Sequence, residues 1–469
     1  MALIGREKEI EILKSCYDSD KAEFVAIYGR RRVGKTFLVK ELFEKEFAFY
    51  STGVLNGTKE AQLRVWNSEI ARFGGRDLPE ASDWIGAFEN LNLLIGRSGD
   101  GRKVVFLDEI PWMATLHSDF LAGLDFFWNR WGSSRKDLLL IICGSAASWI
   151  VDSIIDNKGG LHNRLTRTLF IEAFTLRECE QYYESRNIPM TRYQMAEAYM
   201  IFGGIPYYLS LMDARLSLYQ NVDETYFRQG AELGSEFENL YRSLYQNADN
   251  YIQVVETLAK KGIGLTRKEI SDTAGIKDGG TLTKVLCNLS ISGFIREYRA
   301  YGRKKRDSVY QLLDPFSLFD LRFRDKRKEQ SSDFWLRFSS ASAHSAWSGF
   351  AFEKLCLLHL PQIRKSLGIS GVLTSVFSWR GEGTDKAQID MVIDREDKLI
   401  NLCEIKYSSG PYEIDKKYLE SLRNKRAAFV NSTKTRKAVQ TTMITTFGLK
   451  RNAYGAEIVS EVVLDDLFD

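Results

Sequence analysis

Short apolar runs alternate with segments of helical periodicity along the first third of the chain. The apolar runs lie at 24–28, 104–107 and 138–143, and the segment from 35 to 45 has apolar positions three and four residues apart. Continuous apolar runs are typical of strands buried on both faces, and strands that alternate with helices form parallel sheets. The pattern predicts a parallel α/β sheet with helices on both of its faces.

The pattern changes twice after this region. From 173 to 246 apolar positions recur every three or four residues, which predicts a helical lid or bundle. From 247 to 314 three helix-like segments precede two strand-like ones, which is the order of a winged helix-turn-helix. The polar, basic stretch at 315–345 is expected to be a connector. From 346 to 469 an amphipathic helix leads into three strands, a further helix and a closing strand.

Composition limits the class of protein. The 469 residues exceed what one hydrophobic core usually supports, so we expect three domains, with two or four as alternatives. Hydrophobic residues make up 44% of the chain, aromatic residues 12%, and there are only seven prolines, which favours a packed globular protein over a disordered one. The 65 basic and 62 acidic residues nearly cancel, so any attraction to nucleic acid has to be local.

Cysteine and histidine usage excludes several kinds of site. The six cysteines include no C-x-x-C pair, which argues against a disulfide framework or a zinc ribbon and favours a reducing cytoplasm. The four histidines are too dispersed for a zinc hydrolase or a catalytic triad. No stretch approaches the ~18 apolar residues that span a bilayer, so we expect a cytoplasmic protein with no membrane partner.

A phosphate-binding motif lies between the first apolar run and the helix after it. Residues 29–36 read GRRRVGKT, a full match to G-x-x-x-x-G-K-[ST]. The glycines let backbone N–H groups fold around phosphates at a helix N-terminus, whose dipole favours an anion. Lys35 brings a positive charge to the β- and γ-phosphates, and the Thr36 hydroxyl faces Mg²⁺. The residues expected to bind ATP here are Gly29, Arg30, Arg31, Arg32, Val33, Gly34, Lys35, Thr36 and Phe37.

Polar residues end the next two buried strands. Asp108 and Glu109 follow the apolar run at 104–107, and Ser145 follows the run at 138–143. A carboxylate at a strand end beside the phosphate loop holds Mg²⁺, which is the role expected of Asp108 together with Thr36. Glu109 is expected to orient or deprotonate the attacking water. Ser145 either bonds the γ-phosphate or this water, or lies in a plain turn.

Five stretches in order resemble one protein family. They read LIGREKEIEIL at 3–13, YGRRRVGKT at 28–36, VVFLDEIPWM at 104–113, IICGSAAS at 141–148 and GGIPYYL at 203–209. With them the chain resembles the prokaryotic ATPases of the extended AAA/STAND class, often called archaeal-type ATPases. The resemblance implies a P-loop ATPase core at 1–172 that binds and hydrolyses ATP with Mg²⁺.

The same resemblance adds expectations about the nucleotide. It implies that Gly5 and Arg6 lie near the adenine edge, and that Pro206 in the lid faces the base or ribose. Relatives carry a Gly-Arg pair where this chain has Asn163 and Arg164. Arg164 is therefore either an arginine finger or sensor, or a surface arginine.

The winged-helix region has two candidate contacts with DNA. The segment 281–289 is the candidate recognition helix, with Thr283, Lys284 and Asn288 as its polar residues. The hairpin tip at 299–306 carries clustered cations, which release counterions when they meet a phosphate backbone. Packing of this region against the ATPase is the alternative.

The C-terminal part carries carboxylates and a lysine on neighbouring strand-like segments. Asp390 lies in QIDMVID, and Glu404 and Lys406 lie in LCEIK, where they project to the same face of a strand. This succession resembles the PD-(D/E)xK nuclease superfamily, in which an acidic residue of a preceding helix, here Glu353, stands beside the metal. The resemblance implies Glu353, Asp390 and Glu404 as Mg²⁺ ligands and Asp390, Glu404 and Lys406 as catalytic residues. A relic fold in which Glu404 and Lys406 form a plain ion pair is the alternative.

Two functions remain. In the first, the nucleotide state of the ATPase controls a metal-dependent DNA nuclease. In the second, the chain is a nucleotide-dependent switch that binds DNA or protein, and the nuclease-like fold is only a platform. DNA, a partner protein and a second copy of the chain are the partners considered. Convergence of Glu353, Asp390, Glu404 and Lys406 within reach of one metal separates the two functions.

Overall fold

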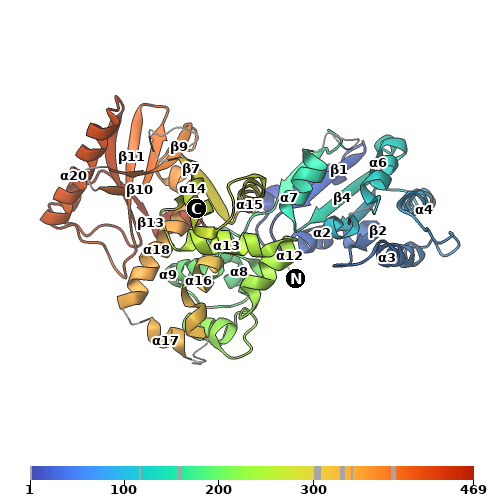
Figure 1. Cartoon of the computed structure of the whole chain (residues 1–469), viewed down its shortest axis with the longest axis horizontal. Coiled ribbons are helices and arrows are strands. Elements are labelled where there is room, and N and C mark those ends of the chain that lie inside the picture. Colours follow the sequence, from blue (N-terminus) through green and yellow to red (C-terminus); the bar gives the residue numbers. More distant parts are fainter. Residues whose placement is uncertain are drawn as a thin grey trace. The chain divides into compact units, whose positions relative to one another are not determined.

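The chain divides into two compact units, Met1–Glu172 and Ala173–Asp469, in a computed structural model (Figure 1). The structure describes residues 3–115, 118–156, 161, 163–299, 301, 308–327, 333–339, 342–381 and 387–469. Within them, no helix is long and apolar enough to cross a membrane.

The first unit is built on a five-stranded parallel sheet. Its strand order is β2-β3-β4-β1-β5, and every neighbouring pair is parallel. The strands are β1 (Glu23–Tyr28), β2 (Phe47–Thr52), β3 (Lys103–Asp108), β4 (Leu138–Gly144) and β5 (Arg167–Phe170). All residues of β3 and β4 are buried. The predicted parallel α/β sheet is therefore confirmed.

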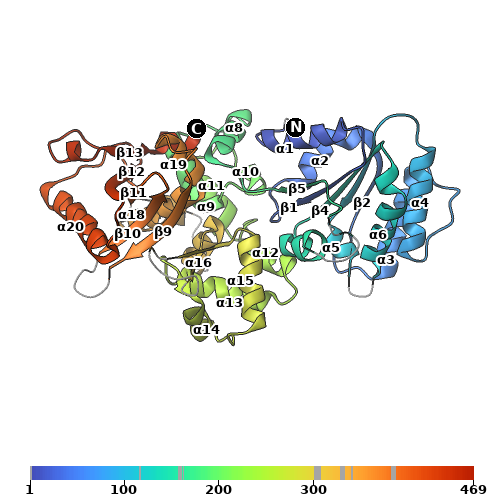
Figure 2. The same ribbon diagram turned by 90° about the horizontal axis from the view of Figure 1, so that it is seen from above.

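Helices cover both faces of this sheet, and Figure 2 shows α1 and α2 on the side opposite α3, α4 and α6. Alternate residues of a strand face opposite ways, so Phe24 and Val105 pack with Trp66, Trp84 and Phe120 on one face. The helices are α1 (Glu7–Tyr17), α2 (Lys35–Phe43), α3 (Lys59–Arg72), α4 (Trp84–Arg97), α5 (Ile110–Met113), α6 (Phe120–Arg130) and α7 (Ala147–Ile150).

The second unit begins with helices. They are α8 (Leu176–Ser185), α9 (Arg192–Phe202), α10 (Pro206–Ser210), α11 (Leu218–Val222), the π-helical turn η4 (Asp223–Phe227) and α12 (Glu236–Leu244). Capping boxes begin α8 at Thr175, α9 at Thr191 and α11 at Ser217, where side chains satisfy the first free backbone N–H groups. These local signals explain why the stretch expected to be a helical lid breaks into several helices.

A group of three helices and a small antiparallel sheet follows. It contains α13 (Ala248–Ala259), β6 (Leu265–Thr266), α14 (Arg267–Ala274), α15 (Gly280–Ile291), β7 (Ile295–Arg299) and β8 (Ser308–Leu312), with strand order β6-β8-β7. On α15, Thr283 and Lys284 are exposed, but Asn288 is buried and donates to the Tyr251 hydroxyl at 2.8 Å. Asn288 is therefore unavailable to DNA. The predicted cationic tip at 303–306 lies outside the described residues.

The β7–β8 hairpin packs against the C-terminal part of the same unit. The Tyr301 backbone N–H donates to the Ser378 carbonyl at 3.1 Å, and the Tyr301 ring contacts Phe377 and Phe429. These contacts lie within the second unit, whereas the alternative considered from the sequence was packing against the ATPase.

The stretch expected to be a connector contains helices where it is described. They are α16 (Pro315–Arg327), α17 (Phe334–Phe338) and the start of α18 (Ser342–Leu358). Phe319, Phe323 and Trp335 are buried and pack on one another. The average polarity of this segment is high because α16 buries only one side and carries charged residues on the other. The average therefore does not indicate the aromatic residues that are buried.

A second five-stranded sheet completes the unit. Its order is β13-β12-β11-β10-β9, with β9, β10 and β11 antiparallel and β11, β12 and β13 parallel. The elements are α19 (Leu360–Ser366), β9 (Thr374–Arg380), β10 (Gln388–Arg395), β11 (Leu399–Lys406), α20 (Lys416–Thr433), β12 (Ala438–Thr445) and β13 (Ser460–Val463). Two strands, rather than the single one expected, follow α20, which packs against β12.

Candidate functional site

The loop between β1 and α2 is shaped by its glycines. Gly29 has φ +150°, and a Cβ there would lie 2.3 Å from the carbonyl oxygen of Ile171. Gly34, the residue before α2, has φ +92°, a conformation that glycine adopts without strain. The loop therefore turns tightly and directs its backbone toward the N-terminus of α2, as a phosphate-binding loop requires.

Lys35 is the first residue of α2 and its side chain is folded into the loop. The residue is only 4% exposed. Its Nζ donates to the carbonyls of Gly29 and Arg30, both at 2.9 Å, and to the Ser145 hydroxyl at 3.0 Å. The ammonium is thus fixed at the centre of the loop and joins it to the end of β4.

Thr36 and Asp108 come together across the sheet edge. The Thr36 hydroxyl donates to Asp108 Oδ2 at 2.8 Å, and the backbone N–H of Glu109 donates to Asp108 Oδ1 at 3.0 Å. Asp108 is 4% exposed and ends β3, close to the carboxyl end of β1 because parallel strands end at the same edge. The two predicted oxygen ligands for Mg²⁺ are therefore neighbours.

Glu109 is held by the next strand. Its backbone lies in the left-handed region, with φ 48°. The Ser145 N–H donates to Glu109 Oε2 at 3.0 Å, and the Ser145 hydroxyl donates to Glu109 Oε1. Lys35, Ser145 and Glu109 therefore form one hydrogen-bonded chain at the ends of β1, β3 and β4.

Arg6 has a role that the sequence did not reveal. Its Nη2 donates to the carbonyls of Val33 at 3.2 Å and Glu172 at 2.6 Å, so it ties the phosphate loop to the segment after β5. Gly5 precedes it with φ +62°. The contacts are backbone carbonyls, for which no side-chain pattern in the sequence is diagnostic.

The other predicted nucleotide residues are distributed around the loop or outside it. Val33 is buried, whereas Phe37 is 39% exposed on α2. Arg164 is exposed on the turn before β5. Pro206 begins α10 in the second unit.

The sequence model of a family described as an ATPase domain predominantly from Archaea matches residues 3–212. Residues 3–212 form an archaeal-type ATPase domain. The ATPase domain has the P-loop NTPase-like α/β fold with a central parallel sheet, and the match continues through α8, α9 and α10. Nucleotide binding is therefore the activity that the family carries.

Two curated relatives come from Methanocaldococcus jannaschii. An uncharacterised protein is 24% identical over 413 residues, which cover 86% of this chain and 87% of the relative. An uncharacterised ATP-binding protein is 42% identical over 43 residues, which cover 9% of this chain and 73% of the relative. The first similarity extends well beyond the ATPase domain.

Two solved structures are similar at low sequence identity. A Walker-type ATPase of Pyrococcus abyssi matches with a TM-score of 0.48 and 18% identity, covering 68% of this chain and 96% of that one. Cdc6p of Pyrobaculum aerophilum matches with a TM-score of 0.32 and 14% identity, covering 70% of this chain and 96% of that one.

Outside the ATPase domain, the predicted C-terminal residues gather around β10 and β11. The register pairs Met391 with Cys403, and the neighbouring Asp390 accepts from the Ile405 backbone N–H at 3.3 Å through its Oδ2. Burial raises the pKa of the Glu353 carboxyl to about 7, and the negative charge of Asp390 adds to this rise. Lys354 and Lys406 oppose it. Glu353, Asp390, Glu404 and Lys406 are therefore close enough to act on one another.

Glu404 already has a cationic partner. Lys425 of α20 donates to its two carboxylate oxygens at 2.7 and 2.8 Å. Within the described residues, no group of three or more His, Cys, Asp or Glu side chains is arranged to hold a metal ion. The assignment of Glu353, Asp390 and Glu404 as Mg²⁺ ligands stays a prediction, and the ion pair that Glu404 makes in the structure is with Lys425 rather than with Lys406.

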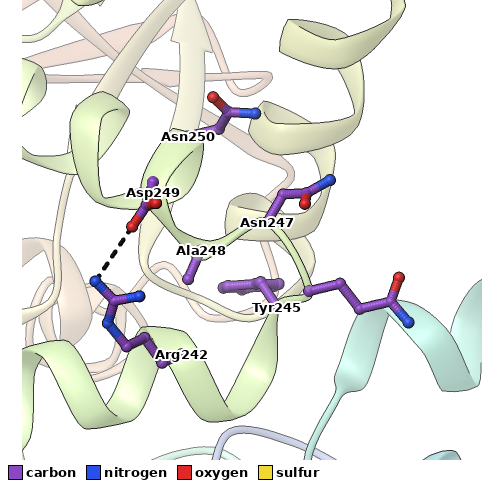
Figure 3. A pocket seen from close by; sticks show the side chains of 7 residues that line it. Arg242, Tyr245, Asn247, Ala248, Asp249 and Asn250 are labelled. Atoms are coloured by element: carbon purple, nitrogen blue, oxygen red, sulfur yellow. Dashed lines mark ion pairs between the residues drawn. The ribbon is translucent and has the colours of Figure 1, made fainter.

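A separate cavity of about 370 Å³ lies at the turn between α12 and α13 (Figure 3). Its lining includes Arg242 and Asp249, which form an ion pair at 3.3 Å and are both largely exposed. Its lining residues all lie between 242 and 250, and none of them is a predicted site residue. The cavity is a polar surface recess rather than the nucleotide site.

Proposed function

We propose that this chain binds ATP at 29–36 and hydrolyses it with Glu109, and that its nucleotide state switches binding of DNA or a partner protein. The hydrogen-bonded chain of Lys35, Ser145 and Glu109 is the observation that supports the proposal most strongly. It joins the phosphate loop to the carboxylate that would act on water. In a Gly-rich turn without a phosphate-binding role, the lysine is not expected to belong to a hydrogen-bonded chain that reaches the ends of two further strands.

The side chains divide the work of hydrolysis. Lys35 and the loop N–H groups neutralise and orient the phosphates, so that the γ-phosphate faces Glu109. Glu109 orients a water and accepts its proton as the water oxygen bonds to the γ-phosphorus and the bond to the β-phosphate oxygen breaks. Ser145 fixes the Glu109 carboxylate, and the Ser145 hydroxyl also accepts from Lys35. A movement of Lys35 when the phosphates change would therefore alter the position of Glu109, the general base.

The residues present fit Mg²⁺. Thr36 and Asp108 offer two hard oxygen donors, which are the ligand type that Mg²⁺ prefers. Bound there, Mg²⁺ would neutralise charge on the β- and γ-phosphates.

For the C-terminal region, the geometry favours the candidate in which the nuclease-like fold is only a platform and does not cleave DNA. The ion pair between Lys425 and Glu404 occupies the carboxylate that a nuclease would give to a metal. Control of a metal-dependent DNA nuclease by the nucleotide state is the second candidate, and the proximity of Glu353, Asp390 and Lys406 supports it. The order of α13, α14, α15 and the β6-β8-β7 sheet supports a winged helix, with Lys284 exposed as one contact to DNA.

The variant Glu109→Gln tests both parts of the proposal. It should bind ATP but hydrolyse it about 10²–10⁴-fold more slowly, because a general base is removed while the phosphate contacts stay. Glu44→Gln, an exposed glutamate just after α2, is the matched control and should hydrolyse normally. Normal turnover in Glu109→Gln would refute the assignment.

The trapped variant also separates the two C-terminal candidates. Single- and double-stranded DNA would be mixed with each protein, ATP and Mg²⁺ or Mn²⁺. A switch changes its affinity for DNA or a partner in Glu109→Gln and leaves the DNA intact. Metal-dependent cleavage that Asp390→Ala abolishes would establish the nuclease instead.

A further inference from the structure

The buried carboxylate of Glu404 is neutralised from within the protein. Glu404 is 2% exposed in the middle of the second sheet. Lys425 approaches both of its oxygens to within 2.8 Å, and the Tyr418 hydroxyl donates to Oε2 at 3.4 Å. Both partners come from α20, so one helix supplies the side-chain hydrogen bonds that Glu404 makes in the described structure.

A carboxylate in this position needs a cation. Removing an ionised group from water is costly unless a charge and hydrogen bonds replace the lost hydration. In a metal site a divalent cation supplies that charge. Here the ammonium of Lys425 supplies the charge through two short, charge-assisted hydrogen bonds. For the single carboxylate of Glu404, these two bonds replace a metal cation.

The surrounding charges balance in the same way. Glu353 and Asp390 stand near Glu404, and Lys354 lies 4.0 Å from Glu353. Lys354 is itself fixed, because its Nζ donates to the Gly262 carbonyl at 2.9 Å. The cluster holds three carboxylates, Glu353, Asp390 and Glu404, and three lysines, Lys354, Lys406 and Lys425. When all six of these groups are ionised, their charges cancel without any divalent ion.

We propose that Lys425 takes the place of a divalent cation at Glu404, so that this cluster is a metal-independent structural site that fastens α20 to the sheet. The residues do not fit the metal that the nuclease-like succession implies, since binding it would require expulsion of a paired, partly buried lysine. The cluster therefore has the carboxylates and the lysine of the nuclease-like succession, but the counter-ion of Glu404 is the side chain of Lys425. The inference concerns the C-terminal sheet alone and stands or falls separately from ATP hydrolysis.

The test is a titration with Mn²⁺ of the full chain without nucleotide, followed by thermal unfolding. Wild-type protein and Asp390→Asn should respond identically to Mn²⁺, because neither binds it at this cluster. Lys425→Met should unfold at a temperature lower by roughly 5–10 °C, since it leaves Glu404 buried and unpaired. Mn²⁺ should then restore much of that loss, because three carboxylates face only two lysines.

Three further variants make the result decisive. Lys425→Met combined with Asp390→Asn should lose the rescue by Mn²⁺, and Lys425→Arg should behave as wild type because its charge remains. Lys416→Met, an exposed lysine of the same helix, should change nothing. A Mn²⁺ response of the wild type that Asp390→Asn abolishes would overturn the proposal, as would a folded Lys425→Met that ignores Mn²⁺. If Lys425→Met does not fold, the comparison of wild type with Asp390→Asn still decides.

Discussion

A single buried histidine illustrates how strongly this protein fixes protonation states at the residue scale. His359 Nε2 accepts from the Leu176 N–H at 3.0 Å, at the first turn of α8. Its Nδ1 lies 2.9 Å from the Leu355 carbonyl, so the proton is on Nδ1. Burial lowers the pKa of His359 to about 4. The imidazole is therefore neutral and serves as a cap between α18 and α8.

This histidine predicts a loss of stability in acid. Because the unfolded chain takes up a proton near pH 6.5 and the folded chain only near pH 4, the folded state loses stability as the pH falls between these values. From pH 7.5 to pH 5 the loss is about 2 kcal/mol. Urea unfolding at both pH values should show this extra loss in wild type and not in His359→Gln. Equal losses in the two proteins would contradict the prediction.

The candidate nucleotide residues could be proposed from the sequence because local patterns mark them. Lys35 and Thr36 follow the loop glycines directly, and Asp108 ends an apolar run. Arg6 and Lys425 could not be assigned in this way. Arg6 bonds backbone carbonyls, and Lys425 lies 21 residues from its carboxylate partner on a helix with several other cations. Their roles depend on tertiary contacts, which leave no local pattern.

At the scale of elements, one aspartate connects two helical segments of the second unit. Both carboxylate oxygens of Asp223, in the turn η4, accept from the first backbone N–H groups of α17, at Trp335 and Leu336, at 2.7 and 3.0 Å. A helix begins with free N–H groups, and here a residue more than a hundred positions earlier satisfies them.

Asp223→Ala should therefore destabilise the protein by about 1–3 kcal/mol, since one buried and one part-buried N–H group lose their acceptor. Glu224→Ala, which removes only a surface ion pair with Arg228, should cost less than about 1 kcal/mol. Denaturant unfolding of the two variants measures the difference. Similar values for both would show that Asp223 does not hold α17.

Long, uniform patterns predicted elements well, and short or mixed ones did not. The apolar runs of β1, β3 and β4 were recognised because both faces of these strands are buried. The sequence predicts one closing strand after α20, whereas the structure has two, β12 and the four-residue β13. The sequence of α16 and α17 predicts a connector because the buried aromatic residues of these helices stand among charged ones. Burial on one side only leaves average polarity high.

In the whole molecule, the ATPase domain matched by the family model and the first compact unit end at different residues. The ATPase domain covers residues 3–212, whereas the first compact unit ends at Glu172. The helices α8, α9 and α10 thus belong to the family's domain by sequence and to the second unit by packing. The relative that aligns over 86% of this chain shares both parts. The boundary of the family's domain therefore does not coincide with the boundary between the two compact units.

Binding of ATP at the loop around Lys35 can be measured by isothermal titration calorimetry of the full chain with ATP and Mg²⁺. Wild type and Lys45→Ala, an exposed lysine just after α2, should bind ATP with equal affinity. Lys35→Ala should lose about 100-fold or more in affinity, because a buried charge-assisted contact to phosphate disappears. An unchanged affinity in a folded Lys35→Ala variant would show that ATP does not bind at this loop.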